Sequence, residues 1–144
     1  MKKIQSGIFA IIIGINSLAY GASLNSLDKE KIENALVNKT LVSIGTDNLN
    51  GKTIENTFSM YLDNKGNILG KMGHKPVDEP QNDKGVYIIN DDGSFSITWE
   101  HWDGAKQISG HLYETENAYI SIDDQNVFHT AFMKESIKTG NHLN

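Results

Sequence analysis

Residues 85–113 read GVYIINDDGSFSITWEHWDGAKQISGHLY, in which two Asp-Gly pairs separate three runs of β-branched and aromatic residues. An Asp-Gly pair between alternating apolar residues is the strongest local signal of a β-hairpin. The stretch therefore predicts a three-stranded antiparallel meander. In that meander a two-residue turn at Asp103-Gly104 sets Trp99 opposite Ile108.

The second run of the meander divides its side chains between two faces. Phe95, Ile97 and Trp99 lie on one face, followed in the same alternation by His101, whereas serine and threonine residues lie between them on the other face. An apolar face opposite a polar face is typical of an antiparallel sheet with one side in water.

The register of the first run is open. A three-residue loop after it turns Tyr87 and Ile89 inward, whereas a two-residue turn points Val86 and Ile88 inward. A shift of one residue exchanges the two faces of a strand, so the two registers predict opposite interiors.

Similar alternating runs lie on both sides of the meander. They predict strands over residues 39–46, 54–63, 118–122 and 127–137, with another strand directly after a three-residue loop at 64–66. That loop sets Leu62 opposite Ile68, Met60 opposite Gly70 and Phe58 opposite Met72. About eight strands with short connections predict an all-β fold, an antiparallel eight-stranded up-and-down barrel with a short N-terminal helix.

The first 21 residues have the anatomy of a secretory signal. Lys2 and Lys3 precede an apolar run over residues 8–15, and small residues stand at Ala19 and Gly21. We expect residues 1–21 to be a signal peptide cleaved after Gly21, which predicts a periplasmic or secreted product.

The rest of the chain divides into three parts. Residues 22–38 contain a predicted helix over 26–37, with Ser26 as its N-cap and an apolar stripe of Leu24, Leu27, Ile32, Ala35 and Leu36 that packs on the barrel. Residues 39–137 form the barrel domain, and residues 138–144 follow as a loose C-terminal tail.

Composition narrows the range of partners. The formal charge of -5 becomes about -7 when Lys2 and Lys3 are removed with the signal peptide, and the chain contains no cysteine. An acidic product is not expected to bind nucleic acid or an anionic membrane surface, and no integral membrane association is expected after cleavage. Without disulfides, the hydrophobic core alone must hold the domain together.

Motifs for chemistry are missing from the sequence. It has no Gly-x-Ser-x-Gly, no Gly-rich phosphate loop and no closely spaced histidine pair, and its acidic turns lack the twelfth-position ligand of a calcium loop. We therefore expect no catalytic residues, no metal site and no cofactor. These absences favour a protein that is not an enzyme and leave an enzyme or metal carrier as a third, open hypothesis.

Several short motifs resemble those of a known group. After the signal and the helix come Lys39-Thr40-Leu41, Gly85-x-Tyr87, Asp92-Gly93, Ile97-x-Trp99, Tyr113 and Gly140-Asn141. Together they resemble small exported bacterial proteins with a lipocalin-like (calycin-type) β-barrel. The resemblance implies a barrel and no particular reaction, because a fold alone does not define a function.

Two functions follow from these expectations. The first is a non-enzymatic binding module for a small apolar or amphipathic ligand, with a site inside the barrel lined by Trp99, Tyr87, His101, Phe58, Met60 and His129. The alternative is a protein interaction module whose interior is filled by its own side chains and which contacts partners through residues 73–84 and Trp102. Trp102 itself either caps the barrel end or forms part of a contact patch.

Overall fold

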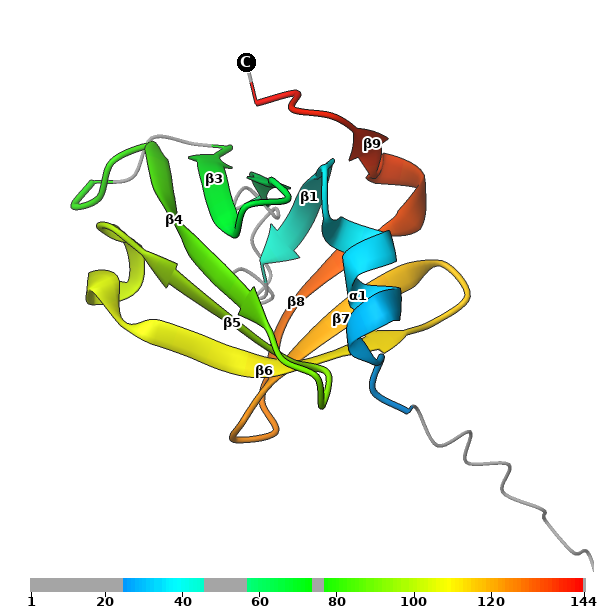
Figure 1. The fold of residues 1–144 in the computed structure, drawn as a ribbon. Helices are drawn as coiled ribbons and strands as arrows, with labels where there is room; N and C mark the ends of the chain where they lie inside the picture. Colours follow the sequence, from blue (N-terminus) through cyan, green and yellow to red (C-terminus); the bar gives the residue numbers. More distant parts are fainter. Residues whose placement is uncertain (1–24, 46–56, 74–76, 144) are drawn as a thin grey trace, which may run out of the picture.

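Eight antiparallel strands close into a barrel in the computed structural model, which describes residues 25–45, 57–73 and 77–143 (Figure 1). The strands are β1 (Lys39–Gly45), β2 (Thr57–Leu62), β3 (Asn67–Met72), β4 (Asn82–Ile89), β5 (Ser94–Trp99), β6 (Gln107–Glu114), β7 (Ala118–Asp123) and β8 (Phe128–Met133). Each strand pairs with the next, and β1 pairs with both β2 and β8, so the sheet closes. This confirms the predicted fold class. Among the described residues, no helix is long and apolar enough to cross a membrane.

The β2–β3 hairpin has the predicted register. Leu62 lies opposite Ile68, Met60 opposite Gly70 and Phe58 opposite Met72. Its loop is held locally: the carboxylate of Asp63 accepts hydrogen bonds from the backbone N–H groups of Lys65 and Asn67, and Gly66 takes a φ of 86°. Only glycine enters this left-handed region without a steric cost.

The β4–β5 connection uses the three-residue loop, which settles the open register. Ile89 lies opposite Phe95, so Tyr87 and Ile89 point inward, whereas Val86 and Ile88 are 51% and 54% exposed. The loop closes at Gly93, whose backbone has a φ of 80°. The N–H of Gly93 donates to the carbonyl of Asn90.

The β5–β6 connection differs from the prediction. Ile97 lies opposite Ile108, so the predicted pairing of Trp99 with Ile108 is wrong by two residues. Residues 100–106, which we call the Trp102 loop, replace the two-residue turn and contain a short 3-10 segment, η2 (Trp102–Ala105). Because a shift of two residues preserves the faces of a strand, Trp99 still points inward.

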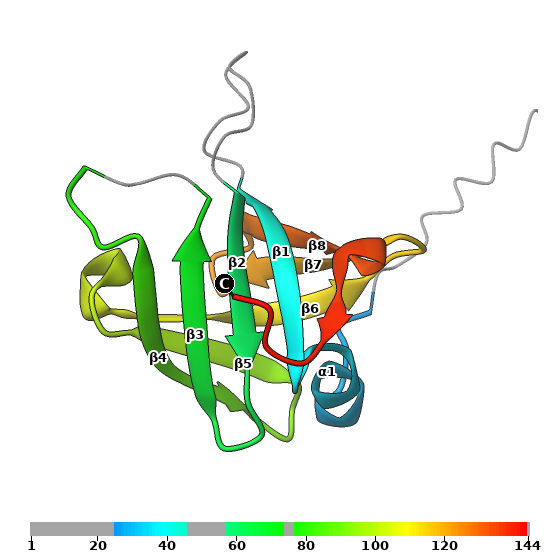
Figure 2. The ribbon, with the colours of Figure 1, turned by 90° about the horizontal axis from the view of Figure 1, so that it is seen from above.

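Helix α1 (Lys29–Leu36) packs at the end of the barrel where β1 begins (Figure 2). Its N-cap is Asp28, whose carboxylate accepts from the N–H of Lys31, and not Ser26 as predicted. Ser26 instead forms a β-bridge with Tyr113, so the chain is still extended there. The helix buries Ile32, Ala35 and Leu36, and Leu27 is buried just before it.

The end of the chain is tied to the barrel, unlike the loose tail expected for residues 138–144. The strand predicted over 127–137 ends as β8, and a 3-10 turn, η3 (Lys134–Ser136), leads to β9 (Lys138–Thr139), which pairs with β1 beside it (Figure 2). The hydroxyl of Thr40 donates to the carbonyl of Gly140 and accepts from the N–H of His142. These bonds fix the tail through residue 142. Residues 1–21, which are predicted to be a signal peptide, and Leu24 lie outside the described residues.

Candidate functional site

The barrel interior is nearly filled. Met60, Trp99 and Phe132 are at most 5% exposed, and Phe58 is half-buried. The cavity left beside them has a volume of about 40 Å³, and its lining includes Phe58 and His129. A small-molecule site typically measures about 300–1,000 Å³, whereas a water occupies about 30 Å³ in the liquid. The cavity in this structure therefore has room for water-sized molecules only.

The six residues predicted to line the interior site fall into three places. Phe58, Met60, Trp99 and His129 border the small cavity, and His129 is itself exposed. Tyr87 is buried in the core but does not border that cavity, and its hydroxyl donates to the backbone carbonyl of Asp63. Burial and the nearby Asp63 carboxylate raise the pKa of the Tyr87 hydroxyl.

His101 lies outside the barrel, so its predicted inward position is corrected. Its side chain is 62% exposed, because β5 ends at Trp99 and the alternation does not continue into the Trp102 loop. The His101 Nδ1 lies 3.0 Å from Oδ1 of Asp83, whose side chain is 1% exposed.

Asp83 organises this loop, and the sequence reasoning missed it. Its Oδ2 accepts from the backbone N–H groups of His101 and Trp102 at 2.9 and 2.8 Å. Burial acts to raise the pKa of Asp83, but the hydrogen bonds from Trp102 and His101 outweigh burial and lower the pKa. The available signal was an aspartate at an inward-facing position of β4, in alternation with Tyr87 and Ile89.

Asp83, Glu100 and His101 are also the one group within the described ranges whose metal-binding atoms lie within 4.8 Å of one another. Bonds within the protein explain why these three side chains lie together. The Asp83 carboxylate holds the Trp102 loop, and a carboxylate oxygen of Glu100 lies 3.2 Å from the ammonium of Lys84. We therefore interpret this cluster as structural.

Trp102 caps the barrel end. It is 2% exposed, and its ring centroid lies 4.7 Å from that of Trp99 with the two planes tilted by 55°. Its Nε1–H donates to the carbonyl of Pro80 at 2.7 Å. In this conformation the indole is not available to a partner, which corrects its predicted role in the alternative function.

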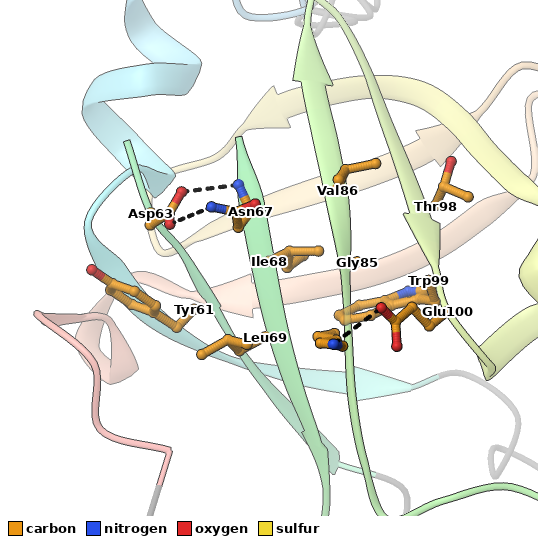
Figure 3. A pocket seen from close by; sticks show the side chains of 11 residues that line it. Tyr61, Asp63, Asn67, Ile68, Leu69, Gly85, Val86, Thr98, Trp99 and Glu100 are labelled. Atoms are coloured by element: carbon orange, nitrogen blue, oxygen red, sulfur yellow. Dashed lines mark hydrogen bonds and ion pairs between the residues drawn. The ribbon is translucent and has the colours of Figure 1, made fainter. Parts of the chain in front are cut away.

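A much larger hollow is a groove on the outside of the barrel (Figure 3). It has a volume of about 600 Å³ and crosses β2, β3, β4 and β5. We call it the outer groove; its lining residues are Tyr61, Asp63, Asn67, Ile68, Leu69, Lys84, Gly85, Val86, Thr98, Trp99 and Glu100. Most of them occupy outward positions, which the sequence pattern alone describes as an ordinary solvent face.

Apolar and charged groups are separated within the outer groove. Leu69 and Val86, which are 37% and 51% exposed, project from its middle strands. The Asp63–Asn67 pair and the Lys84–Glu100 ion pair stand on opposite sides (Figure 3). Hydrogen bonds lower the pKa of Asp63, and the largest contribution comes from the side chain of Asn67. This carboxylate is therefore charged at neutral pH. The groove thus combines an apolar floor with polar ends.

Comparison with protein-family models, curated proteins and solved structures finds no match for the chain.

Proposed function

We propose that the protein is an exported, non-enzymatic binding module that holds a small amphipathic cation in the outer groove. The observation that carries this proposal is the contrast in volume, about 600 Å³ in the groove against about 40 Å³ inside the barrel. Of these two spaces, only the groove falls in the size range of small-molecule sites. A second surface hollow beside α1 has a similar volume of about 670 Å³, but most of its lining residues are polar or charged, so it offers less apolar contact than the groove. The barrel then serves as a rigid scaffold, in keeping with the resemblance to exported lipocalin-like proteins.

The charges that line the outer groove favour a cationic ligand. The groove carries two carboxylates, Asp63 and Glu100, against one ammonium, Lys84. The chain as a whole has a formal charge of -5. An apolar body against Leu69 and Val86 gains burial energy, and an amine or guanidinium at the groove's end gains attraction to the unbalanced carboxylate.

A titration with three molecules of one shape tests the charge preference. We would add 3-phenylpropylammonium, 3-phenylpropanol and 3-phenylpropanoate to ¹⁵N-labelled mature protein and follow the amide spectrum. The proposal expects shifts centred on β3 and β4, with affinity highest for the cation and lowest for the anion. Equal affinity for all three molecules, or shifts centred on the small cavity inside the barrel, would contradict the proposal.

Two variants on one strand test the location. Val86 lines the outer groove, whereas Ile88 is equally exposed on β4 but does not line it. We expect Val86→Lys to weaken binding of the cation by about tenfold or more, through lost apolar contact and charge repulsion. Ile88→Lys should leave it within about twofold, because exposed sites outside a contact contribute little. A protein partner seated on the outer face of β4 would cover both residues, and its binding would be weakened by both substitutions.

Export rests on the anatomy of residues 1–21 and has its own test. Expression of the full chain in a bacterial host should give a periplasmic or secreted product. Its intact mass should equal that of a chain whose first residue is Ala22. A cytoplasmic product of full mass would contradict export without affecting the groove.

A further inference from the structure

Trp102 is buried although it belongs to a connecting loop rather than a strand. We propose that the Trp102 loop is a removable plug, and that the space now filled by its indole is a binding site for a planar aromatic molecule with an N–H donor, of the indole class. This site lies at the barrel end and borders the outer groove at Trp99, which lines both.

The space around the Trp102 indole is shaped for a flat ring. One side is the Trp99 ring, 4.7 Å away between centroids, and the Pro80 carbonyl accepts the Nε1–H at 2.7 Å. Gly70 makes the room: a Cβ there would lie 2.4 Å from Cζ3 of Trp102 and 2.8 Å from Cη2 of Trp99. The walls and the acceptor are therefore supplied by β3, β5 and the segment before β4, and remain when the plug leaves.

The loop that carries the indole is strained. Asp103 and Ala105 both have a φ of 57°, on either side of Gly104 at 64°. Left-handed backbone is unfavourable for residues that have a Cβ, and such strain is found where a segment has two states. The loop tip is exposed, and within the described chain no atom lies within 4 Å of a Cβ built on Gly104. Release of the indole relieves this strain, and no described residue packs against the loop tip at Gly104.

Asp83 holds the plug in place as a positioning residue. Its carboxylate binds the N–H of Trp102 and of the preceding residue, His101, and so fixes the root of the loop rather than its tip. Opening replaces these bonds and the indole contacts by water, and closure restores the strain in the loop. The open fraction is set by the balance between them.

Hydrogen exchange measures that open fraction. Trp99 and Trp102 are the two tryptophans of the chain, so the spectrum of ¹⁵N-labelled protein contains two indole N–H signals. When the loop recloses faster than exchange occurs, the exchange rate of the Trp102 signal reports the open population. We expect Ala105→Gly to slow it about threefold to tenfold, because relieved strain outweighs the added flexibility of glycine in the open loop.

Asn126→Gly provides the matched control. Asn126 also has a positive φ, 61°, but lies in the β7–β8 turn. Asparagine tolerates the left-handed region better than alanine, so this variant relieves less strain, and each change in exchange rate is compared with the change in the free energy of unfolding of the same variant. If the plug opens locally, Asn126→Gly should leave the Trp102 exchange rate unchanged. Slowing by both variants in proportion to their gains in unfolding free energy would mean that the indole is exposed only by global unfolding, and would overturn the proposal.

A titration with free indole tests the site itself. Indole should move the Trp102 N–H signal of the wild type to the position of a solvent-exposed indole, and Ala105→Gly should weaken its binding by the factor measured in exchange. Benzofuran, which lacks the N–H, should bind less tightly because it leaves the Pro80 carbonyl without a donor. Trp102→Ala should bind indole more tightly than the wild type. A folded Trp102→Ala protein that does not bind millimolar indole would overturn the proposal; if this variant does not fold, the comparison of Ala105→Gly with the wild type decides.

Discussion

The β4–β5 loop and the Trp102 loop contain the same Asp-Gly dipeptide, yet only the first forms a tight hairpin. In the first, Asp92 bonds the N–H of Ser94 and Gly93 takes the left-handed conformation that closes three residues. In the second, Asp103-Gly104 is also left-handed but lies at the tip of a longer loop. The glycine of the dipeptide is left-handed in both loops. The second loop is longer because the neighbouring Trp102 is buried.

Removal of the buried indole should have the largest effect on the difference between the two loops. Trp102→Ala should lower the free energy of unfolding by about 3–5 kcal/mol, as large-to-small changes of buried aromatic residues do. Urea denaturation followed by circular dichroism measures it. Asp91→Ala, at the 96% exposed tip of the β4–β5 loop, is the control and should leave stability close to the wild-type value. Similar losses from both substitutions would mean that burial of Trp102 is not what distinguishes the loops.

The two loops also differ in the space around their glycines. A Cβ on Gly93 would lie 2.3 Å from the backbone carbonyl oxygen of Leu27, whereas none of the described atoms lies within 4 Å of one on Gly104. Gly93→Ala should therefore cost about 2–4 kcal/mol through strain and overlap, and Gly104→Ala about 1–2 kcal/mol through strain alone. Thermal and urea unfolding of the two variants measure the difference. A larger cost at Gly104 would contradict the packing described for the first loop.

Gly70 links the Trp102 loop to the barrel wall. Gly70→Ala should destabilise the protein by about 1–3 kcal/mol, because its methyl group overlaps the indole of Trp102. In a Trp102→Ala background part of that cost should disappear, which a double-mutant cycle reports as a coupling energy. Independent, additive effects would mean that Gly70 does not make room for the indole.

Asp83 gives the Trp102 loop a dependence on pH. Its pKa is lowered below 3.8 in the folded protein, so the stabilisation is complete above the unfolded pKa and is lost as pH falls through the folded value. Asp83→Asn should cost about 1–3 kcal/mol at pH 7. Its difference from the wild type should shrink as the pH is lowered below 3.8. Urea unfolding at a series of pH values tests this, and a difference that grows in acid would contradict the assignment.

Local patterns in the sequence determined much of this protein. The period of two in a strand predicted which side chains point inward, and Phe58, Met60 and Trp99 do so. The three-residue loop at 64–66 predicted the β2–β3 register, because its Asp63 and Gly66 need only their own neighbours. Both rules act over a few residues, and a sequence displays them directly.

Contacts between distant residues decided the rest. The β5–β6 register depends on Trp102 packing beside Gly70 and Trp99, and on Asp83 holding the loop. The outer groove arises because outward side chains from four strands meet on a curved surface, and the tail is ordered by bonds to Thr40, about a hundred residues earlier in the chain. A sequence pattern records the face on which a side chain lies, but the partner it meets there is set only when the barrel closes.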